Sequence, residues 1–304
     1  MSNAQTVLVV GSVALDSLET PAGQRHECLG GSASYFSVGA SFFAPVQVVA
    51  VVGDDFPEAH LAHLRARDVN LRGLEVVKGG RTFRWRGRYG SNFGDAQTLE
   101  TQLNCFEHFD PKLPPEFRQT KLLFLGNIDP DLQLKVLGQL DSPHLVALDT
   151  MNFWIQGKRE ALLRVLSRVD LFILNETEAR LLSGETNIYK AADAVRAMGP
   201  STIVIKRGEY GAMLFHEEGL FVCPAWPVRD VVDPTGAGDT FASGLIGHLA
   251  REGNQDFATM KRAVVTGTVL ASFACEGFSL DRLLALTSGE IARRSGEMAS
   301  HFAL

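Results

Sequence analysis

Residues 230–241, DVVDPTGAGDTF, place two carboxylates on either side of a turn made of small residues. Gly236, Ala237 and Gly238 leave consecutive backbone N–H groups uncovered, and the apolar pattern that follows predicts a helix starting at this turn. Such a turn, with the positive end of the helix dipole, favours binding of a phosphate or an oxyanion. Asp239 at the edge of this anion site fits a general base that takes a proton from an alcohol, with helix capping as the structural alternative.

This segment resembles the second signature of the ribokinase-like (PfkB) family of ATP-dependent carbohydrate and nucleoside kinases. The resemblance implies that Asp239 is the catalytic base and that the backbone of Gly236, Ala237 and Gly238 forms the anion hole. It also places Asp233 among the cofactor-binding residues. A base beside amides that face a transferring phosphoryl group suits this chemistry, which depends on positioning and on stabilisation of charge.

Two motifs near the amino terminus resemble the acceptor side of the same family. GSVALD resembles its first strand and turn, which implies that Asp16 binds acceptor hydroxyls. Two carboxylate oxygens can accept hydrogen bonds from a vicinal diol, the group that a sugar ring offers. LGGSASYF resembles the Gly-Gly acceptor loop and places Gly30 and Gly31 against the sugar. Tyr35, expected to contact the acceptor, stands where the family commonly has Asn, a difference that bears on the substrate.

Two later motifs resemble the nucleotide side. NETEARLL resembles the Asn-x-x-Glu motif, which implies that Asn175 binds the cofactor and that Glu178 holds magnesium through water. A strand followed by Asn and a helix is also common without any such role. IKRGEYGA resembles a glycine-containing turn that places Lys206, Gly208 and Gly211 near the phosphates or ribose. The implied cofactors are ATP and Mg²⁺, with a monovalent cation as an open addition.

Residues 78–106 are rich in arginine and aromatic residues and alternate with a period of two, which predicts a small β-structure outside the main sheet. The resemblance implies a β-lid over the acceptor, with elements around 12–30 and 78–106. The alternation predicts one face with Arg84, Arg86 and Arg88 and another with Phe83, Trp85 and Tyr89. An inward aromatic face suits a sugar or a nucleobase, and an inward arginine face suits an acidic acceptor. Solvated arginines, and aromatics packed on the body or on a second subunit, are the structural alternatives.

Asn104 lies in this lid region and Asn127 at a strand end, where an α/β sheet places its ligands, so both are expected to bind substrate. The motif LDTMN resembles a strand-end motif of the family, but Trp154 stands where the family often has Arg.

Short apolar runs alternate with helical patterns along the chain, the order of βαβ units. Strands are predicted within 6–15, 47–53, 121–128, 144–150, 170–176 and 201–208, helices at 32–43, 57–68, 157–168 and 190–198, and a hairpin at 212–225. Because most of these runs are continuously apolar, both faces of the sheet are expected to be covered. We predict one α/β domain over residues 1–304, a ribokinase-like three-layer sandwich with a mainly parallel central sheet and a small β-lid.

The composition excludes several classes of function. A net charge of −6 over 304 residues argues against nucleic acid as a partner, and no Walker loop is present. The four cysteines show no metal-site spacing, which favours reduced thiols, and no apolar stretch approaches the roughly 20 residues that span a bilayer. We therefore expect a cytoplasmic protein without membrane contact, binding ATP and a small sugar or nucleoside, with a homodimer through the lid as an option.

The leading hypothesis is an ATP-dependent phosphotransferase that phosphorylates a hydroxyl of a small sugar. A nucleoside kinase of the same family is the first alternative, favoured by Tyr35 and the aromatic lid residues. A catalytically silent relative that binds a nucleotide or a sugar is the second. Asp239 and the intact anion hole argue against silence.

Overall fold

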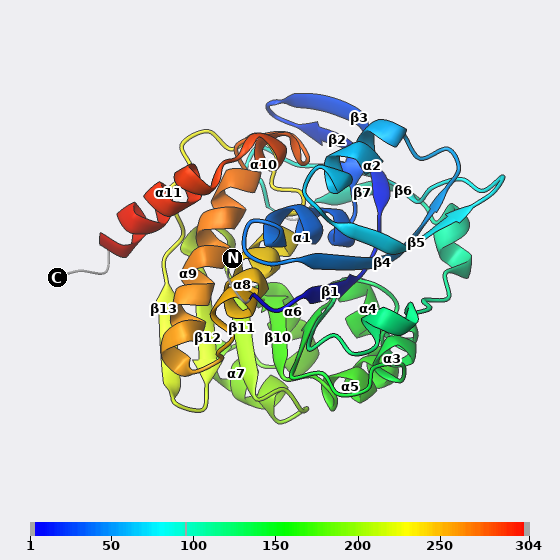
Figure 1. Ribbon diagram of the computed structural model, residues 1–304. Helices are drawn as coiled ribbons and strands as arrows, with labels where there is room; N and C mark the ends of the chain where they lie inside the picture. Colours follow the sequence, from blue (N-terminus) through cyan, green and yellow to red (C-terminus); the bar gives the residue numbers. More distant parts are fainter. Residues whose placement is uncertain (1–3, 95, 301–304) are drawn as a thin grey trace.

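The computed structural model describes residues 4–94 and 96–300, and its core is a nine-stranded sheet (Figure 1). In spatial order the strands are β13 (Gly219–Cys223), β12 (Ala212–His216), β11 (Thr202–Lys206), β10 (Leu171–Asn175), β9 (Leu145–Asp149), β8 (Leu122–Leu125), β1 (Val7–Val10), β4 (Val46–Gly53) and β5 (Asn70–Val77). The strands from β11 to β5 pair in parallel, and β12 and β13 join them antiparallel. The mainly parallel sheet is therefore confirmed.

All six apolar runs predicted as strands lie in this sheet, and the predicted hairpin forms β12 and β13. The strands at the centre are buried along their whole length, which is why their sequences are continuously apolar. Strand β5 was not predicted. It lies at the edge of the sheet, and several of its residues are exposed, so that its sequence NLRGLEVV lacks that signal.

Helices cover both faces of the sheet (Figure 1). On one face are α1 (Ser32–Ala40), α2 (Glu58–Arg65), α8 (Ala237–Glu252), α9 (Phe257–Ala274), α10 (Asp281–Ala285) and α11 (Ser288–Ser300). On the other are α3 (Pro130–Leu137), α4 (Asn152–Gly157), α5 (Arg159–Leu166), α6 (Glu176–Ser183) and α7 (Ile188–Arg196). Val7 and Val9 belong to the first core and Leu8 and Val10 to the second, the alternation expected of a strand. The three-layer sandwich is confirmed.

Helices α8 and α9 approach each other closely through glycine. A Cβ atom on Gly244 would lie 2.9 Å from the Cα of Gly267, and one on Gly267 would lie 2.6 Å from the carbonyl oxygen of Phe241. The two backbones therefore touch without side chains between them. Among the described residues no helix is both long and apolar enough to cross a bilayer.

A second, four-stranded sheet lies apart from the first, in the order β3 (Gly23–Gly30), β2 (Ala14–Thr20), β6 (Arg84–Arg88), β7 (Gln97–Gln102) (Figure 1). Its central pair, β2 and β6, is parallel, whereas the outer pairs are antiparallel. It therefore joins segments far apart in the sequence, and it is the small β-lid predicted as part of the fold class.

The lid arginines bind carboxylates of the chain itself. Arg86 and Arg88 hold both oxygens of Glu19, at 2.6 and 2.7 Å. Arg84 pairs with Glu27 and Asp55, each at 2.9 Å. The three arginines are therefore paired with carboxylates of the chain, while the side chains of Arg86 and Arg88 remain about half exposed.

Candidate active site

The central sheet provides a crevice where its strand order reverses. Strand β1 lies between β8 and β4. The chain adds β4 and β5 on one side of β1 and then β8 and the later strands on the other side. In open α/β sheets, ligands bind at the carboxyl ends of the strands at such a point. Gly11 and Gly126 follow β1 and β8, and a Cβ on either would lie 2.6 or 2.8 Å from the Oγ of Ser32. The first residue of α1 thus fits between the two strand ends.

The turn before α8 is shaped by Gly236, its N-cap residue. Gly236 has a φ of 73°, in the left-handed region that favours glycine. A Cβ there would lie 2.3 Å from the ring of Tyr35, which is 1% exposed. Tyr35 was expected to contact the acceptor, but its ring lies buried against the turn. Its position explains how the bare amides of this turn are supported.

Asp239 lies in the first turn of α8, beside Gly236, Ala237 and Gly238 as the sequence places them. Burial and the charge of Asp149 raise the pKa of Asp239 to about 7, against the opposing effect of Lys206. A carboxyl with a pKa near neutrality can accept and release a proton easily at physiological pH, as a general base must.

Lys206 ends β11 and reaches into the same place. Its Nζ lies 3.4 Å from an oxygen of Asp149, and a Cβ on Gly238 would come within 2.9 Å of it. Although burial acts to lower the pKa of Lys206, the charges of Asp149, Glu178 and Asp239 raise it, so the amine is protonated. Within the turn, the Ala237 N–H donates to the Pro234 carbonyl at 3.1 Å, so the site combines this fixed cation with the amides of Gly236 and Gly238. The sequence identifies Asp149 only as a residue at the end of a predicted strand, without a role in this site.

Asp16, on lid strand β2, is 5% exposed and faces the same region. Burial and the charges of Asp233 and Asp239 raise its pKa to about 7, while a hydrogen bond from the Gly31 N–H acts in the opposite direction. A Cβ on Gly30 would lie 2.0 Å from the Asp16 carboxylate. Gly30 and Gly31 therefore lie directly against the Asp16 carboxylate.

Asp233 is fully buried and both of its carboxylate oxygens are engaged. One accepts from the Thr235 N–H and the other from the Ser279 N–H, each at 2.9 Å. These bonds fix the loop before α8 to the segment after α9. The expectation for Asp233 was contact with the cofactor, whereas its bonds here hold the loop that carries the anion site.

The Asn-x-x-Glu motif forms a capping box at the start of α6. The Asn175 side chain accepts from the Glu178 N–H at 2.8 Å, and a Glu178 oxygen accepts from the Asn175 N–H at 2.7 Å. This hydrogen-bonding pattern shows that the motif stabilises the start of a helix, a role it can have without binding any cofactor. Glu178 is also close enough to Lys206 for its charge to act on that amine, so the motif borders the site.

Gly208 and Gly211 form the turn after β11. Both have positive φ, 55° and 89°, and the Arg207 N–H donates to the Gly211 carbonyl at 2.7 Å. A Cβ on Gly211 would lie 2.0 Å from the carbonyl oxygen of Cys223, whereas nothing lies within 4 Å at Gly208. Gly211 is thus required by packing, while Gly208 leaves open space beside the end of the Lys206 strand.

The two asparagines bind other parts of the chain. Asn104 Nδ2 donates to the Thr82 carbonyl at 2.9 Å, within the lid region. Asn127 Oδ1 accepts from the indole N–H of Trp154 at 2.9 Å. Trp154, found where the resemblance would have Arg, therefore orients a strand-end amide.

The lid contacts the anion-site loop directly. The Tyr89 hydroxyl lies 3.2 Å from Thr235 Oγ1, and Thr20 Oγ1 donates to the Val232 carbonyl at 2.8 Å. Nothing in the sequence indicates these contacts, apart from the alternation that places Tyr89 on an aromatic face. These two contacts join the lid to the loop that precedes α8.

The comparisons with known proteins agree with this geometry. Residues 6–282 match the model of the pfkB family carbohydrate kinases. The chain belongs to this family. It is a carbohydrate or nucleoside kinase, and kinases of this family use ATP with Mg²⁺.

The chain is 29% identical to a cytidine kinase from Thermococcus kodakarensis, over 81% of the chain and 88% of that protein. The fold matches a nucleoside kinase from Burkholderia thailandensis, solved in complex with inosine, at a TM-score of 0.80 and 19% identity over 96% of each chain. An E. coli protein described as a ribokinase II, solved with ATP and Mg²⁺, matches at a TM-score of 0.75 and 20% identity, over 95% of this chain and 99% of that one. These structures establish the shared ribokinase-like fold.

Proposed function

We propose that this kinase phosphorylates a hydroxyl of a nucleoside, with Asp239 as the general base. The position of Asp239 carries the proposal. It stands in the first turn of α8, beside the amides of Gly236 and Gly238, and burial and the charge of Asp149 raise its pKa to about 7. Asp16 approaches from the lid closely enough for the charge of Asp239 to act on it. One carboxylate is thus suited to hold the acceptor and the other to deprotonate it.

In this mechanism Asp16 accepts hydrogen bonds from acceptor hydroxyls, with Gly30 and Gly31 keeping its carboxylate in place. Asp239 takes the proton of the reacting hydroxyl as its oxygen bonds to the γ-phosphorus and the bond from that phosphorus to the ADP oxygen breaks. Of the amides of 236–238, those of Gly236 and Gly238, together with the Lys206 amine, stabilise the charge on the phosphoryl oxygens, while the Ala237 N–H holds the turn through the Pro234 carbonyl. The lid excludes water, which suppresses hydrolysis.

The described residues fit ATP and Mg²⁺. Gly236 lets the turn pack against the Tyr35 ring, and the missing Cβ of Gly238 lets the Lys206 amine approach the start of α8, so a fixed cation lies beside the helix amino terminus that would receive the phosphates. Mg²⁺, when bound, neutralises phosphate charge and is suited to oxygen ligands and water. Glu178 would hold it through water, and Asn175, Gly208 and Gly211 would border the nucleotide. We assign Asp233 to the loop and not to direct contact.

A nucleoside acceptor is favoured over a small sugar by the relatives. The cytidine kinase matches over four fifths of the chain, and a nucleoside kinase with bound inosine shares the fold. The sequence alone favours the small sugar, whereas the relatives place it second. The aromatic residues of the lid, Phe83 and Trp85, are suited to a nucleobase.

The test is ADP release from ATP and Mg²⁺ with a panel of nucleosides, free sugars and phosphosugars. We expect one or more nucleosides to stimulate release strongly, and Asp239→Asn to abolish it while ATP binding measured by calorimetry persists. Stimulation by free sugars alone would support the sugar kinase instead. ATP binding without transfer to any member of the panel would support a silent relative. Repeating the assay with K⁺ or Na⁺ at constant ionic strength tests the monovalent cation.

The whole chain is proposed to act as one domain, with a homodimer formed through the lid. Strands β3 and β7 end the small sheet, so each presents an edge to which another strand can pair. Sedimentation of the full chain and of a variant with proline on β7, Thr98→Pro, tests this. A dimer that the proline variant does not dissociate would contradict the lid contact.

A further inference from the structure

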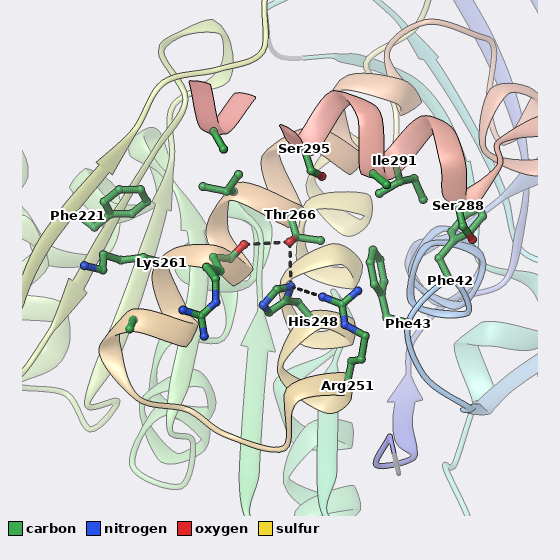
Figure 2. A pocket seen from close by; sticks show the side chains of 15 residues that line it. Phe42, Phe43, Phe221, His248, Arg251, Lys261, Thr266, Ser288, Ile291 and Ser295 are labelled. Atoms are coloured by element: carbon green, nitrogen blue, oxygen red, sulfur yellow. Dashed lines mark hydrogen bonds between the residues drawn. The ribbon is translucent and has the colours of Figure 1, made fainter. Parts of the chain in front are cut away.

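A cavity of about 750 Å³ lies on the sheet face that carries α8, α9 and α11 (Figure 2), and Asp239 is not among its lining residues. It is bounded by α8, α9 and α11, by Phe221 on β13, and by Phe42 and Phe43 after α1. His248, in its wall, stands on the same helix as Asp239 but about 13 Å further along its axis, at 1.5 Å per residue. Nothing in the mechanism above uses this cavity.

The lining of the cavity combines cations with apolar side chains. Arg251, Lys261 and Arg262 contribute positive charge, and none of the described residues that line it is acidic. Arg251 pairs with Glu252 at 3.1 Å, and Arg262 is close enough to Asp256, the N-cap of α9, for its charge to act on that carboxyl, but within the described ranges Lys261 and Arg262 have no carboxylate within 4.0 Å. In a chain of net charge −6, such a one-sided cluster favours an anion.

The position of two of these cations on α9 adds to the argument. Lys261 and Arg262 lie in the second turn of a helix that begins at Phe257, nearer its positive end. The helix dipole does not stabilise cations there, in contrast to Arg251 in the last turn of α8. A ligand that carries negative charge would compensate for this placement.

His248 places a hydrogen-bond donor without a partner in the wall. Its side chain is 6% exposed, and its Nδ1 lies 3.2 Å from the guanidinium of Arg251 and 3.0 Å from Thr266 Oγ1. Because a guanidinium can only donate, Nδ1 must accept, and the neutral ring carries its hydrogen on Nε2. Burial and the charge of Arg251 lower the pKa of His248 to about 4, so the ring is neutral. Nε2 has no acceptor among the described residues.

We propose that this cavity binds a small organic anion with an apolar body, at a site separate from the kinase centre. Its carboxylate, sulfonate or phosphate lies at the end formed by Lys261, Arg262 and the His248 wall. Its apolar body packs against Val265 and Ile291. The cavity volume suits a ligand of this type, since small-molecule pockets commonly range from about 300 to 1,000 Å³.

The probe is 8-anilinonaphthalene-1-sulfonate, an aromatic anion whose fluorescence rises on binding, titrated into the folded full chain. We expect saturable binding to one site, weakened about tenfold or more by Lys261→Glu and by Arg262→Glu. Lys190→Glu on α7, which makes the same change in net charge at an exposed position, is expected to change the affinity less than about twofold. Ala292→Trp, at an exposed lining position, is expected to block binding without disturbing the core.

Several outcomes would overturn the proposal. Equal affinity for the neutral dye N-phenyl-1-naphthylamine would show that the cations play no part. Displacement of the probe by ATP would place it in the kinase site, and loss of binding in Asp239→Asn would do the same. Binding that appears only after deletion of residues 301–304 would indicate an occupant within the chain. Circular dichroism of each variant distinguishes lost binding from lost folding.

Discussion

The two ends of helix α8 differ in almost every chemical respect. At its start, Asp239 adjoins bare amides and lies near Asp149 and Asp16, and burial raises the pKa of these carboxyls. At its end, Arg251 lies with Lys261 and Arg262 beside a neutral histidine, and no acid lines that cavity among the described residues. One helix thus separates a cluster of protonatable acids from a cluster of permanent cations.

This difference shows how local context determines what a charge can do. At the start of α8 the acids are crowded and withdrawn from solvent, so they hold their protons more tightly than usual, and Asp239 and Asp16 exchange theirs near pH 7. At the end, the arginine and lysine charges are fixed across the physiological range, and they can attract an anion but not exchange a proton. Chemistry is therefore expected at one end and binding alone at the other.

The largest expected effect is on kcat, when the same change from a carboxyl to an amide is made at each end of α8. Asp239→Asn removes the base and is expected to lower kcat by about 10³–10⁴-fold. Glu252→Gln, in the last turn of α8, exchanges the same groups on an exposed surface and is expected to leave kcat within about twofold. Steady-state kinetics with the best acceptor measures both. Equal losses would mean that the effect arises from the helix and not from the base.

The next comparison uses the glycines that flank α8. Gly236→Ala brings a Cβ to 2.3 Å from the Tyr35 ring and displaces the amides, so kcat should fall about 100-fold. Gly253→Ala meets no close atom, but its φ of 66° disfavours alanine. It should therefore cost only about 1 kcal/mol of stability, with kcat unchanged. Kinetics and thermal unfolding distinguish them. A fully active Gly236→Ala variant would contradict the anion hole.

The pH dependence of kcat/KM should reflect the acidic end alone. Asp239 must be ionised to act as a base, and its pKa is raised to about 7 by burial and Asp149. The ratio kcat/KM should be constant above about pH 8 and should fall up to tenfold per pH unit below pH 7. The fall should be steeper if Asp16 must also be ionised. Glu252→Gln should leave this profile unchanged. A profile flat down to pH 5 would be inconsistent with the assigned base.

The smallest expected effect concerns stability. Because the pKa of Asp239 is higher in the folded than in the unfolded chain, wild-type stability decreases as the pH rises from about 4 through about 7. Asn carries no such penalty, so Asp239→Asn should be more stable by on the order of 1–3 kcal/mol at pH 8. The gain should vanish near pH 4. Denaturant unfolding at both pH values measures the difference.

The sequence predicts the fold and the turn that precedes α8 well, for local reasons. Continuous, β-branched apolar runs such as those within 6–15 and 47–53 favour a strand covered on both faces, and TGAGD predicts a turn of small residues before a helix. Such signals are contained within a few consecutive residues. The partly exposed strand β5 lacks one and was missed.

The environment of each site residue depends on contacts that the sequence does not display. The burial of Tyr35 beneath Gly236 joins positions far apart in the chain, and the bond from Ser279 to Asp233 joins two loops. The cavity beside His248 is formed by residues from Phe42 to Ala299. No sequence periodicity or motif predicts these tertiary contacts, because they depend on how the helices and sheets pack together.

The glycine contact between α8 and α9 has a consequence for protein engineering. Replacing a helical glycine with alanine commonly gains about 1 kcal/mol through helix propensity, and such exchanges are frequent in stabilisation campaigns. At Gly244 or Gly267 the added methyl would collide with the facing backbone and force the helices apart. Gly296 in α11, where an added Cβ would meet nothing within 4 Å, is the suitable target instead. A consensus or library approach should therefore leave the Gly244–Gly267 seam intact and begin its substitutions at the outer helix.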